Sequence, residues 1–106
     1  MGKSFTFRCI AYQDSNGTFT GVCLDLNIVE EEHGTLEETI FSINEAIESH
    51  FQVAKKLNFP DNLMSRPAPK EYWDKLKEIT EKEDPIEKRS RSFQFYTREV
   101  PTLNYA

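Results

Sequence analysis

Hydrophobic and polar residues alternate over residues 5–12, FTFRCIAY, as expected of a half-buried strand. A polar run follows and ends in Asn16-Gly17. This pair favours a two-residue hairpin loop, because both central positions of a type I′ turn need positive φ. The pattern therefore predicts a hairpin whose second strand covers 18–26, TFTGVCLDL.

The two-residue loop also predicts the register of this hairpin. Cys9 then faces Leu24 on an apolar face of the sheet, and Arg8 faces Asp25 on the other face. Because Cys9 and Cys23 fall on opposite faces, we expect no disulfide within the chain.

The most regular pattern follows a short third strand, predicted over 28–32. Thr35-Leu36-Glu37-Glu38 matches a capping box, in which the threonine hydroxyl accepts a hydrogen bond from the amide three residues later. Apolar residues then recur every three or four positions, at Leu36, Ile40, Ile43, Ile47, Phe51, Ala54 and Leu57. We predict a long helix over 35–57 with this stripe facing the core.

Two further elements complete the predicted fold. A narrow apolar stripe favours a helix over 69–82, and renewed alternation favours a last strand over 93–98, within the segment 92–100. We expect a single α+β domain over 1–106. It would have a three- to four-stranded, mainly antiparallel sheet in the order β-β-β-α-α-β, with the long helix packed on one face.

Charge narrows what this fold can bind. The chain has a net charge of −5, and residues 1–62 hold ten acidic and four basic residues. Such an acidic half repels nucleic acid and suits a basic protein partner. No apolar run approaches the roughly 20 residues of a membrane span. Residues 1–13 also lack the continuous apolar stretch and cleavage site of a signal peptide, so we expect a cytoplasmic protein without membrane contact.

Carboxylates gather at residues 30–32, followed by His33, Glu37 and Glu38, a composition that could bind a divalent metal. Alternation along a strand separates the first three side chains, and helix capping accounts for Glu37 and Glu38. We therefore predict a solvated sheet edge and a helix cap, with no metal and no other cofactor.

Two kinds of catalysis have candidates in the sequence. A metal-dependent nuclease needs clustered carboxylates, but residues 5–12 contain none and Asp25 is matched to Arg8. A thiol enzyme needs an activated cysteine beside a histidine, and Cys23 on an outer face with His33 is the candidate. We expect no enzyme. The alternative is a small enzyme, or a ligand-binding domain, that uses the Cys23–His33 pair.

The run GTFTGVCLDLNIVEEEHGTLEETIFSINEAIESHF resembles the core of HicB-like antitoxins, and the resemblance covers roughly residues 4–57. The residues that carry it are Gly17, Leu24, Leu26, Gly34, Thr35, Leu36, Glu37, Glu38, Asn44, Glu45 and Ala46. Two departures stand out. His33 and Gly34 displace the family's Gly-x-Thr, and the segment 58–91 is longer than the family's usual link to the last strand.

The resemblance implies a partial ribonuclease-H-like fold. It also implies an antitoxin that covers the active site of a small basic, RNA-cleaving toxin. Residues 69–98 run helix then strand, the reverse of a ribbon-helix-helix, so we expect no direct nucleic-acid binding.

Charge and resemblance together predict the residues that contact a partner. Acidic side chains would steer a basic protein, and aromatic side chains would anchor it. The predicted set is Glu37, Glu38, Glu45 and Glu48 for steering and Phe41, Tyr72 and Trp73 for anchoring.

We also expect a homodimer or a higher homo-oligomer, formed through a sheet edge or through the Phe41 region. The reason is that one face of the small sheet would leave Ile10, Tyr12 and Cys23 uncovered.

Overall fold

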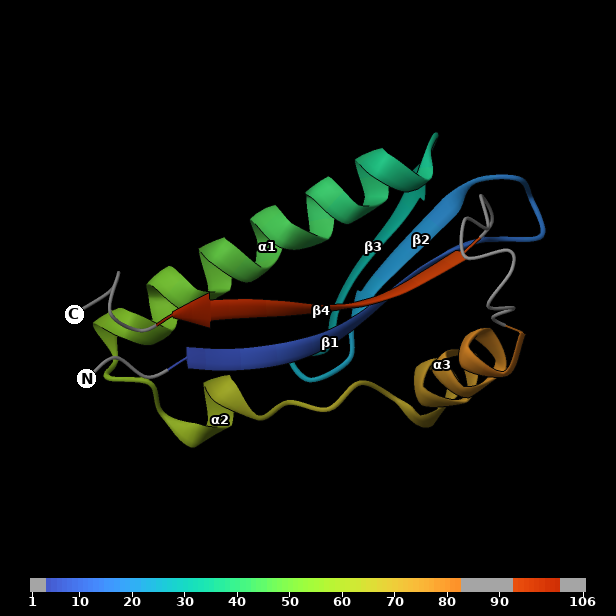
Figure 1. Ribbon diagram of the computed structural model, residues 1–106. Coiled ribbons are helices and arrows are strands. Elements are labelled where there is room, and N and C mark those ends of the chain that lie inside the picture. The colour runs from blue at the N-terminus through green and yellow to red at the C-terminus, as the bar shows by residue number, and fades with distance from the viewer. Residues whose placement is uncertain (1–3, 83–92, 102–106) are drawn as a thin grey trace.

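The structure, a computed structural model, describes residues 4–82 and 93–101 and is an α+β fold. In chain order its elements are β1 Ser4–Gln13, β2 Phe19–Cys23, β3 Ile28–His33, α1 Leu36–Lys56, α2 Asp61–Met64, α3 Lys70–Lys82 and β4 Phe93–Pro101. The strands form one antiparallel sheet in the order β3-β2-β1-β4. Figure 1 shows α1 lying along this sheet, so the predicted fold class is confirmed.

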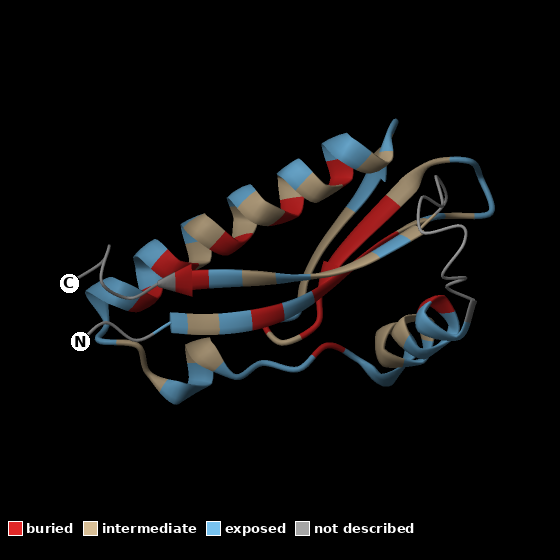
Figure 2. Ribbon diagram, viewed as in Figure 1, coloured by how far each residue is buried: buried red, intermediate tan, exposed pale blue. Residues whose placement is uncertain are grey.

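Both faces of the sheet are covered by helices. On one face α1 buries a cluster that includes Phe7, Cys9 and Cys23, and Figure 2 shows the buried positions of α1 turned toward the sheet. On the other face α3 covers a second cluster that includes Ile10 and Val22. The prediction that one face of the sheet leaves Ile10 and Cys23 uncovered is therefore wrong, because both residues are fully buried and belong to these two cores.

The register of the β1–β2 hairpin differs by one residue from the prediction. Cys9 pairs with Cys23 and Ile10 with Val22, so the two cysteines lie on the same face of the sheet and both are free thiols. The prediction relied on one apolar and one polar face. That contrast is missing here because each face carries its own core.

The loop of this hairpin explains the observed register. Gly17 N donates to Asp14 O at 3.0 Å, and Asp14 N donates to Thr18 O at 2.7 Å, which closes a three-residue loop. Gly17 has a φ of 92°, the left-handed conformation that such a loop requires after its type I turn. The Asn-Gly pair therefore marks the turn correctly, but the loop is one residue longer than expected.

Helix α1 follows its predicted pattern closely. Thr35 caps it by accepting a hydrogen bond from Glu38 N at 3.1 Å. Thr39 is buried although it is polar, because its hydroxyl donates to Thr35 O one turn back at 2.8 Å. The prediction that Leu57 faces the core is wrong, because this residue follows the last helical turn and is 60% exposed.

Close contact between α1 and β2 leaves no room for a side chain at Gly21. A Cβ atom at Gly21 would lie 2.6 Å from Ile43 Cγ1 and 2.7 Å from Thr39 Cγ2. We predict that Gly21→Ala lowers the free energy of unfolding by about 1–3 kcal/mol through overpacking, measured by urea denaturation.

A matched glycine serves as the control for this prediction. A Cβ atom at Gly34 would meet only Glu38 Oε2, at 3.7 Å, so Gly34→Ala should change stability by less than about 0.5 kcal/mol. Thr39→Ser keeps the hydroxyl and removes one of the two clashing carbons, and it should recover part of the loss in the Gly21→Ala background. Equal stabilities of the two alanine variants would contradict the proposed close packing.

Candidate functional site

An open groove of about 600 Å³ lies over the start of α1 and the end of β3. It is lined by His33, Glu37, Glu38, Phe41, Ser42 and Glu45, and most of its lining surface is apolar. Phe41 is the large apolar side chain of this lining, with 65% of its area exposed. We call this feature the Phe41 groove.

The Phe41 groove follows from the helical spacing of α1. Glu37, Phe41 and Glu45 are four residues apart, so they stack along one side of the helix. The opposite side carries Thr39 and Ile43, which are buried against the sheet. One helix therefore presents an inner core stripe and an outer stripe in which an aromatic ring stands between carboxylates.

Residues of β3 complete the groove from the side. His33 pairs with Phe19 beyond a register shift in the β2–β3 ladder, and Glu32 adopts a positive φ of 64° at this irregularity. Ser42 donates a hydrogen bond to Glu30 at 2.6 Å and so ties α1 to β3. Ser42 and His33 were missed as groove residues. Ser42 lies four residues after Glu38, a signal that was available in the sequence.

The electrostatics of the Phe41 groove are uniformly acidic. Three carboxylates line it, from Glu37, Glu38 and Glu45, and its lining contains no lysine or arginine. A carboxylate at the rim of an apolar patch favours a partner that presents a cation next to an apolar side chain.

The structure brings four of the seven predicted contact residues together. Glu37, Glu38, Phe41 and Glu45 share the groove. The remaining three are Glu48, which forms an ion pair with Arg98 of β4 at 3.5 Å, and Tyr72 and Trp73, which pack on the opposite face of the sheet.

Cys23 and His33 do not meet. Cys23 pairs with Ile28 and His33 pairs with Phe19, at opposite ends of β2. Phe19 and Cys23 are four residues apart along β2, which is roughly 13 Å along the sheet. Cys23 is also fully buried against α1, contrary to its expected place on an outer face. The geometry therefore provides no thiol–imidazole pair.

The acidic residues around β3 do not form a metal cage. Over residues 4–82 and 93–101, no group of three or more His, Cys, Asp or Glu side chains is placed to hold a metal ion. Glu30 is bound by Ser42, and Glu37 and Glu38 occupy the first turn of α1.

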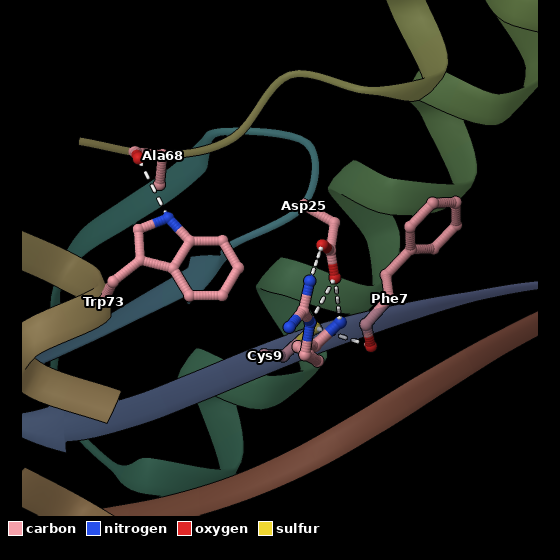
Figure 3. A network of polar contacts seen from close by, with 6 residues as sticks. Phe7, Cys9, Asp25, Ala68 and Trp73 are labelled. Atoms are coloured by element: carbon pink, nitrogen blue, oxygen red, sulfur yellow. Dashed lines mark hydrogen bonds and ion pairs between the residues drawn. The ribbon is translucent and has the colours of Figure 1, made fainter. Parts of the chain in front are cut away.

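The Asp25 carboxylate binds both the backbone and the side chain of Arg8, and Figure 3 shows it directed toward β1. It accepts from Arg8 N at 2.7 Å and forms an ion pair with Arg8 Nη2 at 2.6 Å. The two side chains therefore meet as expected, but the predicted register pairing is wrong, because Leu24 bonds to Arg8 across the ladder and Asp25 follows the end of β2. The Arg8 guanidinium lies 4.6 Å from the centre of the Trp73 ring, and Trp73 Nε1 donates to Ala68 O at 3.0 Å. This network joins the hairpin to α3 and has a structural role.

The protonation of Asp25 reflects this network. Partial burial raises the pKa of the carboxyl, but the hydrogen bonds and positive charge of Arg8 outweigh burial and hold the pKa below its usual range. The side chain is therefore ionised at neutral pH and already saturated by one partner, which leaves it unsuited to acid–base catalysis.

Comparison of the chain with protein-family models, curated proteins and solved structures found no match. The HicB-like resemblance therefore rests on the sequence motif alone. Among the described helices, none combines the length and the apolar character that a membrane crossing requires.

The depressed pKa of Asp25 generates a prediction about stability and pH. A lowered folded-state pKa means that ionised Asp25 stabilises the fold above its unfolded pKa of about 3.9, and that this stability is lost as pH falls through the folded pKa. Asp25→Asn should reduce the free energy of unfolding by about 1–2 kcal/mol at pH 7. The difference from the unmodified chain should disappear in acid, as measured by urea titrations from pH 7 to below pH 3.

Asp74→Asn is the matched control. Asp74 pairs with Lys70 on the surface of α3, and the two side chains are 61% and 88% exposed. Its replacement should cost less than about 0.5 kcal/mol at any pH. A pH-independent difference for Asp25→Asn would show that the lost stability is unrelated to the charge of Asp25.

Proposed function

We propose that this chain is a HicB-like protein-binding module that holds a small basic protein in the Phe41 groove. The observation that carries the proposal is an exposed phenylalanine in an apolar groove whose charged lining residues are all carboxylates. Such an arrangement has an apolar anchor at its centre and a charged rim, which is the anatomy of a protein-binding hot spot.

The physical contribution of each part can be separated. Burial of Phe41 under a partner supplies about 1.5–3 kcal/mol. Glu37, Glu38 and Glu45 add longer-range attraction for a cationic surface, and this attraction weakens as salt rises. The excess of acidic residues in the first half of the chain, ten against four, acts in the same direction.

The resemblance supplies the class of partner. The residues that carry it run through Glu37, Glu38 and Glu45, so the motif overlaps the Phe41 groove. In this proposal the partner is a small basic, RNA-cleaving toxin in the cytoplasm, and the chain acts as an antitoxin by covering it. The chain binds no nucleic acid directly and supplies no catalytic group.

The placement of Tyr72 and Trp73 narrows the proposed contact set. Both side chains pack against the core beneath α3, on the face of the sheet opposite the groove. The binding residues are therefore Glu37, Glu38, Phe41 and Glu45.

The first test is whether the neighbouring reading frame encodes a small basic protein, and the second pairs that protein with this chain. Co-expression should restore growth that the neighbour alone arrests, and the two proteins should co-purify. Phe41→Ala should weaken the complex roughly 30-fold, as expected when a central anchor worth about 2 kcal/mol is removed. Isothermal titration at low salt measures the affinity.

Val53→Ala is the matched control, because Val53 is also an exposed apolar residue of α1, at 54%, and lies outside the groove. It should leave affinity unchanged. Glu37→Lys with Glu45→Lys should weaken binding most at low salt. Unaltered binding by Phe41→Ala, or failure of the unmodified chain to co-purify, would refute the proposed site.

We also propose a homodimer formed through β4. In the described part of the chain β4 pairs with β1 on one side only. Arg8 O points toward β2, where Leu24 N donates to it at 2.8 Å. The N–H and C=O of Thr97, which faces Arg8 across the ladder, are therefore directed away from β1. They are available to the β4 strand of a second copy.

Sedimentation should accordingly give the mass of two chains at micromolar concentration. Thr97→Pro removes one outward N–H without removing a bond to β1, so it should shift the protein to the mass of one chain. A single-chain mass for the unmodified protein would contradict the proposed dimer.

A further inference from the structure

Cys9 and Cys23 stand side by side in the core beneath α1. They are direct register partners on neighbouring antiparallel strands, both are free, and both have no exposed surface. They belong to one cluster with Ile43 and Ile47 of α1. Neither thiol takes part in the proposed binding function, since the Phe41 groove lies on the outer side of the same helix.

The hydrogen bonds between β1 and β2 show which kind of cross-strand pair Cys9 and Cys23 form. Leu24 N donates to Arg8 O at 2.8 Å, so the neighbouring positions 8 and 24 are the hydrogen-bonded pair. Pairs alternate along an antiparallel ladder, which makes Cys9–Cys23 a non-hydrogen-bonded pair, in which Cα atoms lie about 4.5 Å apart and side chains are closest. That separation falls within the roughly 4.4–6.8 Å that disulfides span.

We propose that Cys9 and Cys23 form an oxidation site that closes to an intrachain disulfide in the presence of a peroxide. This inference is independent of the proposed binding function. It follows from the observed register, because the register predicted from the sequence would have placed the two sulfurs on opposite faces.

The chemistry is balanced with hydrogen peroxide as the oxidant. A thiolate attacks one peroxide oxygen, the O–O bond breaks, and the sulfur becomes a sulfenic acid while water leaves. The second thiol then attacks that sulfur, the S–S bond forms, and the S–O bond breaks to release a second water. Two thiols and one peroxide give one disulfide and two waters.

The two sulfurs are not equivalent, which assigns their order. Cys9 Sγ donates a hydrogen bond to Phe7 O at 3.9 Å. The neighbouring Cys9 thiol, and then the backbone at Leu26 and Asp25, lower the pKa of the Cys23 thiol despite its burial. The neighbouring Cys23 thiol and burial raise the pKa of Cys9. Cys23 also ends β2, whereas Cys9 lies inside β1. The position of Cys23 at a strand end therefore assigns it as the attacking thiolate, and Cys9 as the thiol that resolves the sulfenic acid.

Access to the pair comes from its position in the sheet. Cys23 is the last residue of β2, immediately before the turn to β3. Strand ends open locally at lower free energy than strand centres, and hydrogen peroxide is small enough to enter such an opening.

The test treats the native full-length chain with hydrogen peroxide and then analyses its thiols and its mass. Both thiols should be lost together, the intact mass should fall by two hydrogen atoms, and a proteolytic digest should contain the Cys9 peptide linked to the Cys23 peptide. Dithiothreitol should restore both thiols. Retention of both thiols, addition of oxygen without the linked peptide, or linkage only between two chains would each overturn the proposal.

Two serine variants test the assigned order, since serine keeps a hydrogen-bond donor and nearly the same volume. In Cys9→Ser, peroxide should produce a sulfenic acid at Cys23 that dimedone traps. In Cys23→Ser, trapping at Cys9 should be at least tenfold slower. Circular dichroism verifies that each variant is folded, and equal trapping rates would overturn the assignment of Cys23 as the attacking sulfur.

Discussion

An exchange of hydrogen bonds at Asp25 joins the β1–β2 hairpin to the segment that leads into α3. In a regular ladder Arg8 N would donate to Leu24 O. Here the Asp25 carboxylate accepts from Arg8 N instead, and Leu24 O accepts from Ala68 N at 2.8 Å. The segment that follows α2 can therefore cross the end of the hairpin with its backbone groups satisfied, as Arg66 N does on Asp25 O at 2.9 Å.

The course of that segment determines what covers the second face of the sheet. Helix α3 begins at Lys70, two residues after Ala68, and Trp73 is held there by its bond to the Ala68 carbonyl and by the Arg8 guanidinium. Ile10 and Val22 thereby gain a core of their own. A sheet with two covered faces leaves the outer side of α1 as the exposed helical surface over the first core, and that is where Phe41 lies.

The same arrangement explains which features could be predicted from the sequence. Helix α1 was predictable because capping at Thr35 and the apolar repeat through Ile43 and Phe51 are local signals that agree with one another. The register of the hairpin was not, because it depends on a loop one residue longer than the Asn-Gly pair suggests and on a second core that only α3 creates. The packing of Trp73 was not predictable either. A short apolar stripe such as that of α3 is equally compatible with a partner surface and with a core.

Part of the candidate site was predictable for a related reason. Phe41 lies off the core stripe of α1, and its exposure follows from helical geometry alone, as does its place between Glu37 and Glu45. The contribution of β3 to the groove was not predictable, since it depends on the irregular pairing that places His33 opposite Phe19. Residues on one helix can be placed from sequence spacing, but a site shared between two elements requires their register.

Register also decides the chemistry of the core. Because side chains alternate along a strand, a shift of one residue moves Cys23 from one face of the sheet to the other. In the observed pairing it lies opposite Cys9 beneath α1, and Tyr96 of β4 is the next partner of Cys9 across the sheet. Tyr96 donates to Asn44 of α1 at 3.4 Å, so the strand beside Cys9 is connected to the helix that covers the thiols. Helix α1 thus has two chemically separate sides, an inner side that shields a thiol pair and an outer side that presents an aromatic ring among carboxylates.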